Sequence, residues 1–176
     1  ARDAGIPVLT DVSWFLDLLR KNNNVTTIIG ITGTKGKSST AALMNRILEQ
    51  CGKKTILAGN IRKSPLDFLE IKKCKDANAR ASLNAVKFIT NPQFIILELS
   101  SWHIESMHEH KLSPAVALIT NVLKDHLNRH ASFAEYGKVK FCIAAHQEKT
   151  GVLFVNARDP VSRNLAKKHK NSHIIW

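Results

Sequence analysis

The 176-residue sequence predicts an α/β fold, in which helices flank a mostly parallel sheet in a layered domain of the P-loop type. Two observations carry this prediction. Apolar runs at 94–97 and 115–120 are continuous rather than alternating, as in strands that are buried on both faces. Residues 25–58 read as strand, glycine-rich turn, helix and strand, and such a crossover connects parallel strands. The length is sufficient for one well-buried domain.

The first 24 residues predict a short strand and a helix that form a unit of their own. Ile6–Leu9 is the predicted strand, and Thr10 or Asp11 caps the helix that follows. The apolar residues of this helix recur at helical spacing: Val12, Phe15, Leu16 and Leu19. An asparagine-rich run then ends the pattern. Because a lone strand and helix bury little surface, we expect this piece to end a domain that is mostly absent.

A glycine-rich stretch, G-I-T-G-T-K-G-K-S-S-T at 30–40, separates the first predicted sheet strand from a helix. The strand is the apolar run Val25–Ile31, and the helix begins near Lys37 and ends near Gly52. Strand, glycine-rich turn and helix is the context of a phosphate-binding loop. The strict pattern of such loops is not met, because Ile31 stands where the first glycine belongs. A turn that only caps the helix is the simpler alternative.

The chemistry of this stretch suits an anionic ligand. Gly33 and Gly36 permit unusual backbone angles and a close approach of N–H groups to anionic oxygens. The helix that follows directs its unpaired N–H groups and its positive dipole end to the same place. Lys37 is positioned to reach the β- and γ-phosphates of a nucleotide, and the Ser38 hydroxyl to bind Mg²⁺.

The remaining elements continue the alternation of strands and helices. Further strands are predicted at 54–58, 94–97, 115–120 and 151–156, and another begins within 173–176. Helices are predicted at 133–145 and 160–170, and a short helix begins within 65–69. Residues 70–91 are polar and poorly periodic, so no element is predicted there.

Polar residues follow several predicted strands, where open α/β sheets bind their ligands. They are Asn60, Glu98, Asn121, Asp125 and His126, and Lys140 lies on a predicted helix. Glu98 ends its strand in the way an acidic Mg²⁺ ligand does. Taken singly, each residue has an ordinary alternative: a solvated glutamate, a structural histidine and a surface lysine.

Composition argues against other classes of function. The net charge is +12, but the lysines are scattered and no aromatic residues accompany them, so we expect no nucleic-acid binding. No apolar run approaches the roughly 20 residues that span a bilayer. Three widely spaced cysteines indicate reduced thiols in the cytoplasm. A zinc site at His103, His108 and His110 is a weak alternative, because the spacing is wrong for structural zinc fingers.

Four motifs occur in a characteristic order: G-T-K-G-K-S-S at 33–39, E-L-S-S-W-H-I-E at 98–105, N-V-L-K-D-H-L-N-R-H at 121–130 and Y-G-K-V-K at 136–140. Together they resemble the ATP-binding central domain of the Mur ligases, which build the peptidoglycan stem peptide. The serine pair, and Asn60 within G-N-I, resemble the branch that adds D-glutamate. The sequence departs from this pattern at Lys35, where asparagine is common, and at His103, where glutamine is common.

The resemblance implies an ATP site with two Mg²⁺ ions. The ATP phosphates would be bound by Gly33, Thr34, Lys35, Gly36, Lys37, Ser38 and Ser39. Ser38 and Glu98 would hold the first Mg²⁺, and His126 the second. Lys140 resembles the family's carbamylated lysine beside the metals. Lys37, His126 and Lys140 would be the catalytic residues.

The resemblance also implies the substrates and the reaction. UDP-N-acetylmuramoyl-L-alanine would contact Asn60, Ser100 and Ser101, while Asn121 and Asp125 shape the second metal site. Its carboxylate would attack the γ-phosphate of ATP to give an acyl phosphate, from which the amine of D-glutamate displaces phosphate. A Mur-type ligase that adds a different amino acid, and a P-loop nucleotide-binding module without catalysis, are the alternatives.

Members of this family have three domains, and the resemblance covers about residues 25–176. It implies that 1–24 are the C-terminal remnant of the N-terminal UDP-substrate-binding domain with its linker. Residues 25–176 would be a partial central ATP-binding domain, so the chain would be truncated at both ends of the full-length enzyme. We expect a cytoplasmic monomer that is inactive, or nearly so, as a ligase on its own.

Overall fold

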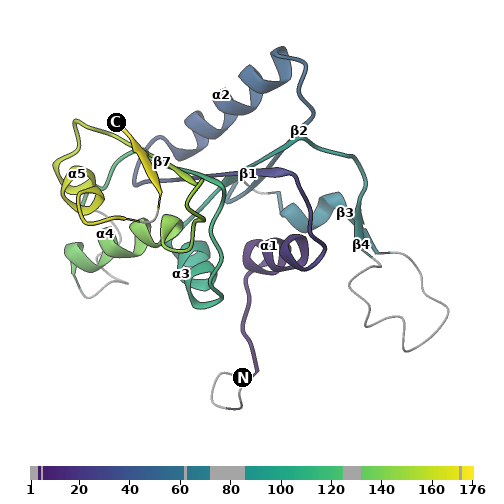
Figure 1. The fold of residues 1–176 in the computed structure, drawn as a ribbon, viewed down its shortest axis with the longest axis horizontal. Coiled ribbons are helices and arrows are strands. Elements are labelled where there is room, and N and C mark those ends of the chain that lie inside the picture. Colours follow the sequence, from purple (N-terminus) through teal and green to yellow (C-terminus); the bar gives the residue numbers. More distant parts are fainter. Residues whose placement is uncertain (1–3, 5, 62, 72–85, 125–131, 171) are drawn as a thin grey trace.

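The computed structural model describes residues 4, 6–61, 63–71, 86–124, 132–170 and 172–176. Its centre is a six-stranded sheet in the order β2-β5-β1-β6-β7-β8, and every pairing in it is parallel (Figure 1). The strands are β1 Thr27–Thr32, β2 Thr55–Gly59, β5 Phe94–Glu98, β6 Val116–Ile119, β7 Val152–Val155 and β8 His173–Ile175. The predicted α/β fold is therefore confirmed. A separate antiparallel pair is formed by β3 Leu69–Ile71 and β4 Val86–Phe88.

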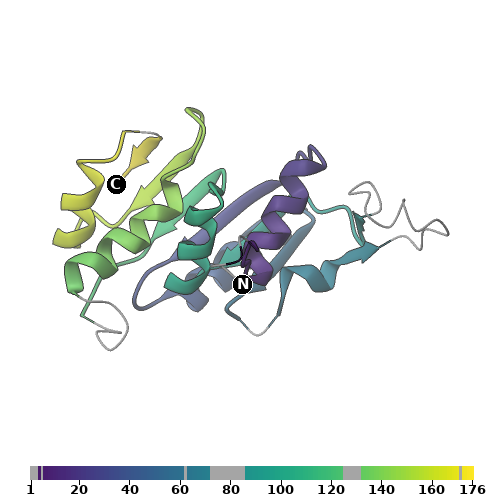
Figure 2. The same cartoon turned by 90° about the horizontal axis from the view of Figure 1, so that it is seen from below.

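Helices cover both faces of the sheet (Figures 1 and 2). On one face lies α2, and on the other lie α1, α3 and α4, with α5 beside α4. The helices are α1 Asp11–Lys21, α2 Lys37–Gln50, α3 Ser101–Glu109, α4 Phe133–Phe141 and α5 Pro160–Ala166. Short 3₁₀ turns span Pro65–Phe68 and Cys142–Ala144. The glycine-rich stretch therefore connects the central strand β1 to the helix α2, which covers one face of the sheet.

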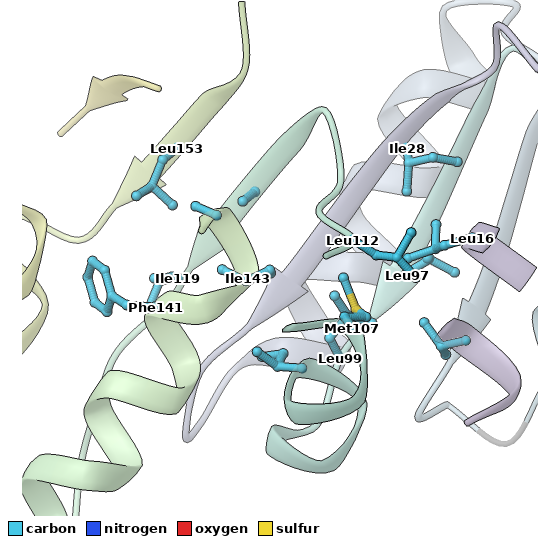
Figure 3. Close-up of a cluster of buried hydrophobic side chains, with 14 of the residues drawn as sticks. Leu16, Ile28, Leu97, Leu99, Met107, Leu112, Ile119, Phe141, Ile143 and Leu153 are labelled. Atoms are coloured by element: carbon cyan, nitrogen blue, oxygen red, sulfur yellow. The ribbon is translucent and has the colours of Figure 1, made fainter. Parts of the chain in front are cut away.

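The core lies on both sides of the central strands, which explains their continuous apolar sequence. Ile95 and Leu97 face the larger cluster, to which α1, α3 and α4 and the neighbouring strands also contribute side chains (Figure 3). Ile96 faces the smaller cluster, together with Ala41 of α2. Each fully buried large apolar side chain stabilises the fold by roughly 1.5–3 kcal/mol through removal from water. The sheet is thus a rigid support for the residues at its carboxyl edge.

The predicted helix in the first 24 residues is confirmed, and its place in the fold is informative. Thr10 caps α1 by accepting a hydrogen bond from the Ser13 N–H group. Phe15 is fully buried in the same cluster as the central strands, so α1 packs against the sheet rather than apart from it. Whether 1–24 belong to a preceding domain stays a prediction.

The strand predicted at Ile6–Leu9 is wrong. Residues 6–10 form no strand, and none of the described strands pairs with them. The carbonyl oxygen of Val8 instead lies 3.1 Å from Nε2 of His110, beyond the end of α3. Backbone groups of an apolar run form a strand only if a neighbouring strand can pair with them. No described strand lies beside this run, and the His110 side chain contacts the Val8 carbonyl instead.

The other element boundaries differ modestly from the predictions. The helix predicted to 145 ends at Phe141 and continues as a 3₁₀ turn, and the helix predicted to 170 ends at Ala166. The helical start predicted within 65–69 is the 3₁₀ turn that ends at Phe68. The sequence did not predict α3 or the β3–β4 pair.

Candidate functional site

The glycine-rich stretch forms a tight loop between β1 and α2. Gly33 has φ +148° and Gly36 has φ +82°, angles that side chains rarely adopt. A Cβ atom at Gly33 would lie 1.9 Å from Oγ1 of Thr120, so only glycine fits there. Gly36 precedes α2, and no side chain caps the helix start. The first-turn N–H groups of a 14-residue helix are therefore available to an anion.

Residues just after β6 hold this loop in place. The Thr34 N–H group donates to the Asn121 carbonyl at 3.0 Å, and the Lys35 N–H group donates to Asn121 Oδ1 at 2.9 Å. The Lys35 carbonyl accepts from Asn121 Nδ2 at 3.1 Å and from the Thr120 hydroxyl at 2.7 Å. Asn121, predicted to shape a second metal site, thus has its amide on the loop backbone. The loop is fixed before any ligand binds.

Two lysine side chains also converge on the loop. Lys37 Nζ donates to the Thr34 carbonyl at 3.1 Å. Lys140 comes from α4 and is only 2% exposed, and its Nζ donates to the Gly33 carbonyl at 3.0 Å. The same Nζ lies 4.4 Å from the centre of the Tyr136 ring, a cation–π distance. The structure therefore brings both predicted catalytic lysines to the loop.

Glu98 ends β5, next to β1 in the sheet, and is 2% exposed. Its Oε1 atom accepts a hydrogen bond from Asn60 Nδ2 at 3.1 Å. Its Oε2 atom is buried and has no hydrogen-bond partner in the described part of the chain. A buried carboxylate oxygen without a partner is costly, and a cation would satisfy it. Carboxylate oxygens are ligands that Mg²⁺ prefers, so Glu98 fits the predicted metal role.

The turn that carries Asn60 depends on Gly59. This glycine has φ +97°, and a Cβ atom there would lie 2.3 Å from the Glu98 carbonyl oxygen. The same carbonyl accepts a hydrogen bond from the Asn60 N–H group at 2.9 Å. The chain can therefore cross the end of β5 closely enough for the Asn60 amide to reach the carboxylate.

A cavity of about 430 Å³ lies beside these groups. It is lined by Lys37, Asn60, Ser100, Ser101, Trp102, His103, Tyr136 and Lys140. The cavity joins a phosphate-loop lysine to the predicted substrate residues at the start of α3. Ser100 caps α3, because its hydroxyl accepts from the His103 N–H group at 3.2 Å. The predicted substrate residues Asn60, Ser100 and Ser101 thus line the same cavity, and their part of its lining is called the substrate wall.

The His103 ring completes the cap of α3. Its Nδ1 atom accepts from the Ser100 N–H group at 3.5 Å, and its Nε2 atom lies 3.7 Å from Oδ1 of Asp11. Burial lowers the pKa of His103, and the negative charges of Asp11 and Glu98 oppose that shift. The ring is therefore held mainly neutral near pH 7, with its proton toward Asp11.

Some predicted residues are not placed, and some contributors were not predicted. Asp125 and His126 lie outside the described residues. Thr120 and Tyr136 shape the site but were not predicted as site residues; Thr120 closes a predicted strand, and Tyr136 opens the fourth motif. Among the described side chains, no three His, Cys, Asp or Glu residues form a group that could hold a metal ion. The alternative zinc site at His103, His108 and His110 is therefore not formed.

A family model described as the Mur ligase middle domain matches residues 31–175. The chain belongs to the Mur ligase family. This is a family of ATP-dependent amide ligases of peptidoglycan precursor synthesis, and the matched part is its ATP-binding middle domain. Within the described ranges, no helix of this Mur ligase chain has both the length and the apolar character needed to cross a membrane.

The sequence of this Mur ligase chain is similar to those of UDP-N-acetylmuramoylalanine–D-glutamate ligases. The one from Symbiobacterium thermophilum is 31% identical over 176 residues, which is 100% of this chain and 33% of the relative. The one from Cupriavidus metallidurans is 35% identical over 141 residues, 80% of this chain and 25% of the relative. The chain therefore spans about a quarter to a third of the curated relatives it matches.

Solved Mur ligase structures share the fold. MurF from Acinetobacter baumannii superposes with a TM-score of 0.67 at 20% identity, over 93% of this chain and 34% of that one. MurF from Thermotoga maritima, in complex with ADP, gives a TM-score of 0.66 at 19% identity, over 95% and 37%. At these identities the similarity concerns the fold alone.

Proposed function

We propose that this chain is the ATP-binding part of a ligase that adds D-glutamate to UDP-N-acetylmuramoyl-L-alanine. Relatives that are 30–36% identical and named as that ligase support this choice of substrates. The observation that carries the nucleotide function is the Glu98 Oε2 atom, which has no hydrogen-bond partner among the described residues, on the strand next to a loop whose helix start has no side-chain cap. A cation would satisfy the Glu98 Oε2 atom, and an anion would accept hydrogen bonds from the N–H groups at the start of α2.

The phosphate side follows from the geometry of the loop. The first-turn N–H groups of α2 and the Lys37 ammonium would bind the ATP phosphates, with the backbone of Gly33–Ser39 around them. The Ser38 hydroxyl and Glu98 would hold Mg²⁺, whose positive charge offsets the negative charge of the phosphates. Because the loop is already fixed by Asn121, little conformational freedom is lost when the nucleotide binds.

The substrate wall lines the same cavity as Lys37. Asn60, Ser100 and Ser101 would orient the UDP-linked substrate so that its carboxylate faces the γ-phosphate near Lys37. The carboxylate would attack that phosphate to give an acyl phosphate with ADP as the leaving group, and the D-glutamate amine would then form the amide bond and displace inorganic phosphate. Lys37 would stabilise the negative charge on the transferred phosphoryl group. On its own, the 176-residue chain would be inactive or nearly so.

Carbamylation of Lys140 needs a change from the present geometry. The Nζ atom now donates to the Gly33 carbonyl as one of the N–H groups of an ammonium. A carbamate nitrogen keeps a single N–H group, while its two anionic oxygens would repel the carbonyl, so we propose that the oxygens of a carbamylated Lys140 face the cavity it lines. We further propose that His126 and Asp125, which lie outside the described residues, contribute to a second Mg²⁺ site that the carbamate would complete.

A binding experiment on the chain tests the nucleotide function. A non-hydrolysable ATP analogue is titrated with and without Mg²⁺, and Mg²⁺ should raise the affinity of the native chain. Glu98→Gln should lose this enhancement, whereas Glu49→Gln, an exposed carboxylate at the far end of α2, should keep it. An undiminished Mg²⁺ effect in Glu98→Gln would contradict the proposed metal role.

A second experiment separates the candidate reactions. The complete gene product that carries this sequence is incubated with ATP, UDP-N-acetylmuramoyl-L-alanine and one amino acid at a time, and phosphate release is measured. Release that depends on D-glutamate supports the proposal. Preference for another amino acid identifies a different Mur-type ligase. Nucleotide binding without release for any acceptor identifies a binding module.

A further inference from the structure

Asp11, the first residue of α1, connects three segments of the chain. Its Oδ2 atom accepts a hydrogen bond from the Ser64 hydroxyl at 2.7 Å. Its Oδ1 atom lies 3.7 Å from Nε2 of His103 on α3. Asp11 itself does not line the cavity, and its side chain is 37% exposed. One of its oxygens therefore faces a residue that lines the cavity, and the other faces the segment that follows Asn60 of the substrate wall.

The two partners of Asp11 support different parts of that wall. His103 lines the cavity and closes the cap of α3, with its Nδ1 atom toward the Ser100 N–H group. Because Nδ1 is the acceptor, the neutral ring carries its proton on Nε2, the atom that faces Asp11. Ser64 follows the turn that carries Asn60, and that turn is closed by a bond from Gly59 N–H to the Lys63 carbonyl at 2.8 Å.

The pairing of α1 with α3 does not depend on Asp11 alone. The Ser13 and Ser106 hydroxyls are hydrogen-bonded at 2.8 Å in a buried position, and Thr10 N–H donates to Ser106 at 3.3 Å. Figure 2 shows the two helices on the same face of the sheet, and Phe15 packs in the shared core. Removal of the Asp11 charge should therefore leave the fold intact and change only the geometry near His103 and Ser64.

We propose that Asp11 is a positioning residue for the substrate side of the cavity and that it acts through His103 and Ser64. The carboxylate fixes the ring on the α3 cap and anchors the turn after β2, which sets the spacing between Asn60 and Ser100. The inference rests on the proposed function, in which this wall binds the UDP-linked substrate. It predicts that a residue before the phosphate loop controls substrate binding without touching ATP.

Steady-state kinetics of the complete gene product test this role. Asp11→Asn keeps the shape of the side chain and its acceptor for Ser64 but removes the charge that faces His103. We expect KM for UDP-N-acetylmuramoyl-L-alanine to rise about tenfold, with KM for ATP changed less than about twofold. Asp17→Asn is the matched control, because Asp17 lies on the same helix but pairs with Arg20 and Lys21 at the surface. It should change neither constant.

A double-mutant cycle shows whether Asp11 acts through the ring. His103→Asn keeps an acceptor near the Nδ1 position and deletes the group that faces Asp11. In that background, the effect of Asp11→Asn should shrink to the small part carried by Ser64. An undiminished effect, or equal changes in KM for both substrates, overturns the proposal.

Hydrogen exchange of the same proteins gives a readout that needs no activity. The amide groups of residues 100–104 should exchange faster in Asp11→Asn than in native protein or Asp17→Asn, with unchanged thermal midpoints. Unaltered exchange there overturns the positioning role. If native protein shows no turnover with D-glutamate while this exchange difference is present, the proposed function fails and the positioning role of Asp11 stands.

Discussion

Replacement of Gly33 by alanine tests the geometry of the phosphate loop most directly. An alanine held at φ +148° costs about 1–3 kcal/mol in backbone strain. Its Cβ atom would also lie 1.9 Å from Thr120 Oγ1, so Thr120 must move. That movement breaks the hydrogen bond of its single O–H group, which the carbonyls of Lys35 and Thr32 share, at a cost of about 0.5–1.5 kcal/mol. We expect Gly33→Ala to lower the free energy of unfolding by about 1.5–4.5 kcal/mol.

Two further variants separate strain from overlap. Gly36→Ala meets a similar backbone restriction at φ +82°, but nothing lies within 4 Å of its Cβ position, so it should cost only about 1–2 kcal/mol. Thr120→Ala removes the overlapping hydroxyl, so Gly33→Ala should cost less in that background. Urea unfolding of the chain, read by circular dichroism, measures each value. Equal losses for Gly33→Ala and Gly36→Ala, with no relief from Thr120→Ala, would refute the packed loop described above.

Lys37→Ala should raise the dissociation constant of an ATP analogue at least about tenfold, because charge-assisted hydrogen bonds contribute roughly 1.5–3 kcal/mol. Lys53 is exposed, so Lys53→Ala should leave the dissociation constant measured by calorimetry unchanged. Stability should also depend on pH. Burial lowers the pKa of His103, His146 and His169 from an ordinary value of 6.5, so the unfolded chain binds protons more readily. The free energy of unfolding is therefore highest above pH 6.5, where these histidines are neutral in both states, and it decreases as pH falls from there toward the folded pKa values. Urea midpoints between pH 7.5 and 5 should fall, less steeply in His103→Asn; a slope unchanged by that substitution would contradict this account.

The central strands were predictable because burial on both faces leaves a continuous apolar run. The predicted run 94–97 lies within β5, and the run 115–120 contains β6. Parallel pairing then brings the carboxyl ends of the strands to one edge, so Glu98 and Asn60 could be expected near Gly33 from topology alone. The site was predictable to the extent that it depends on strand ends.

Helix α3 was not predicted, because serine and histidine occupy places in its sequence that apolar residues usually fill. Ser101 and Ser106 are buried, and Ile104 and Met107 alone form its fully buried apolar surface. Such a helix shows almost no amphipathic period. The direction of the Asn121 side chain could not be predicted either, because a strand-end position does not determine which neighbouring backbone groups an amide will meet.

The two halves of the site differ in how complete they are before a ligand binds. The loop backbone at Thr34 and Lys35 is satisfied by Asn121, so the phosphate side is preorganised. Glu98 retains a buried oxygen without a described partner, so the cation side keeps an unfavourable term that binding would remove. Ligands that bind only the folded state increase its stability. If the proposed function holds, we expect Mg²⁺ and nucleotide to bind more tightly together than separately, because the cation offsets the negative charge of the phosphates and satisfies the Glu98 oxygen.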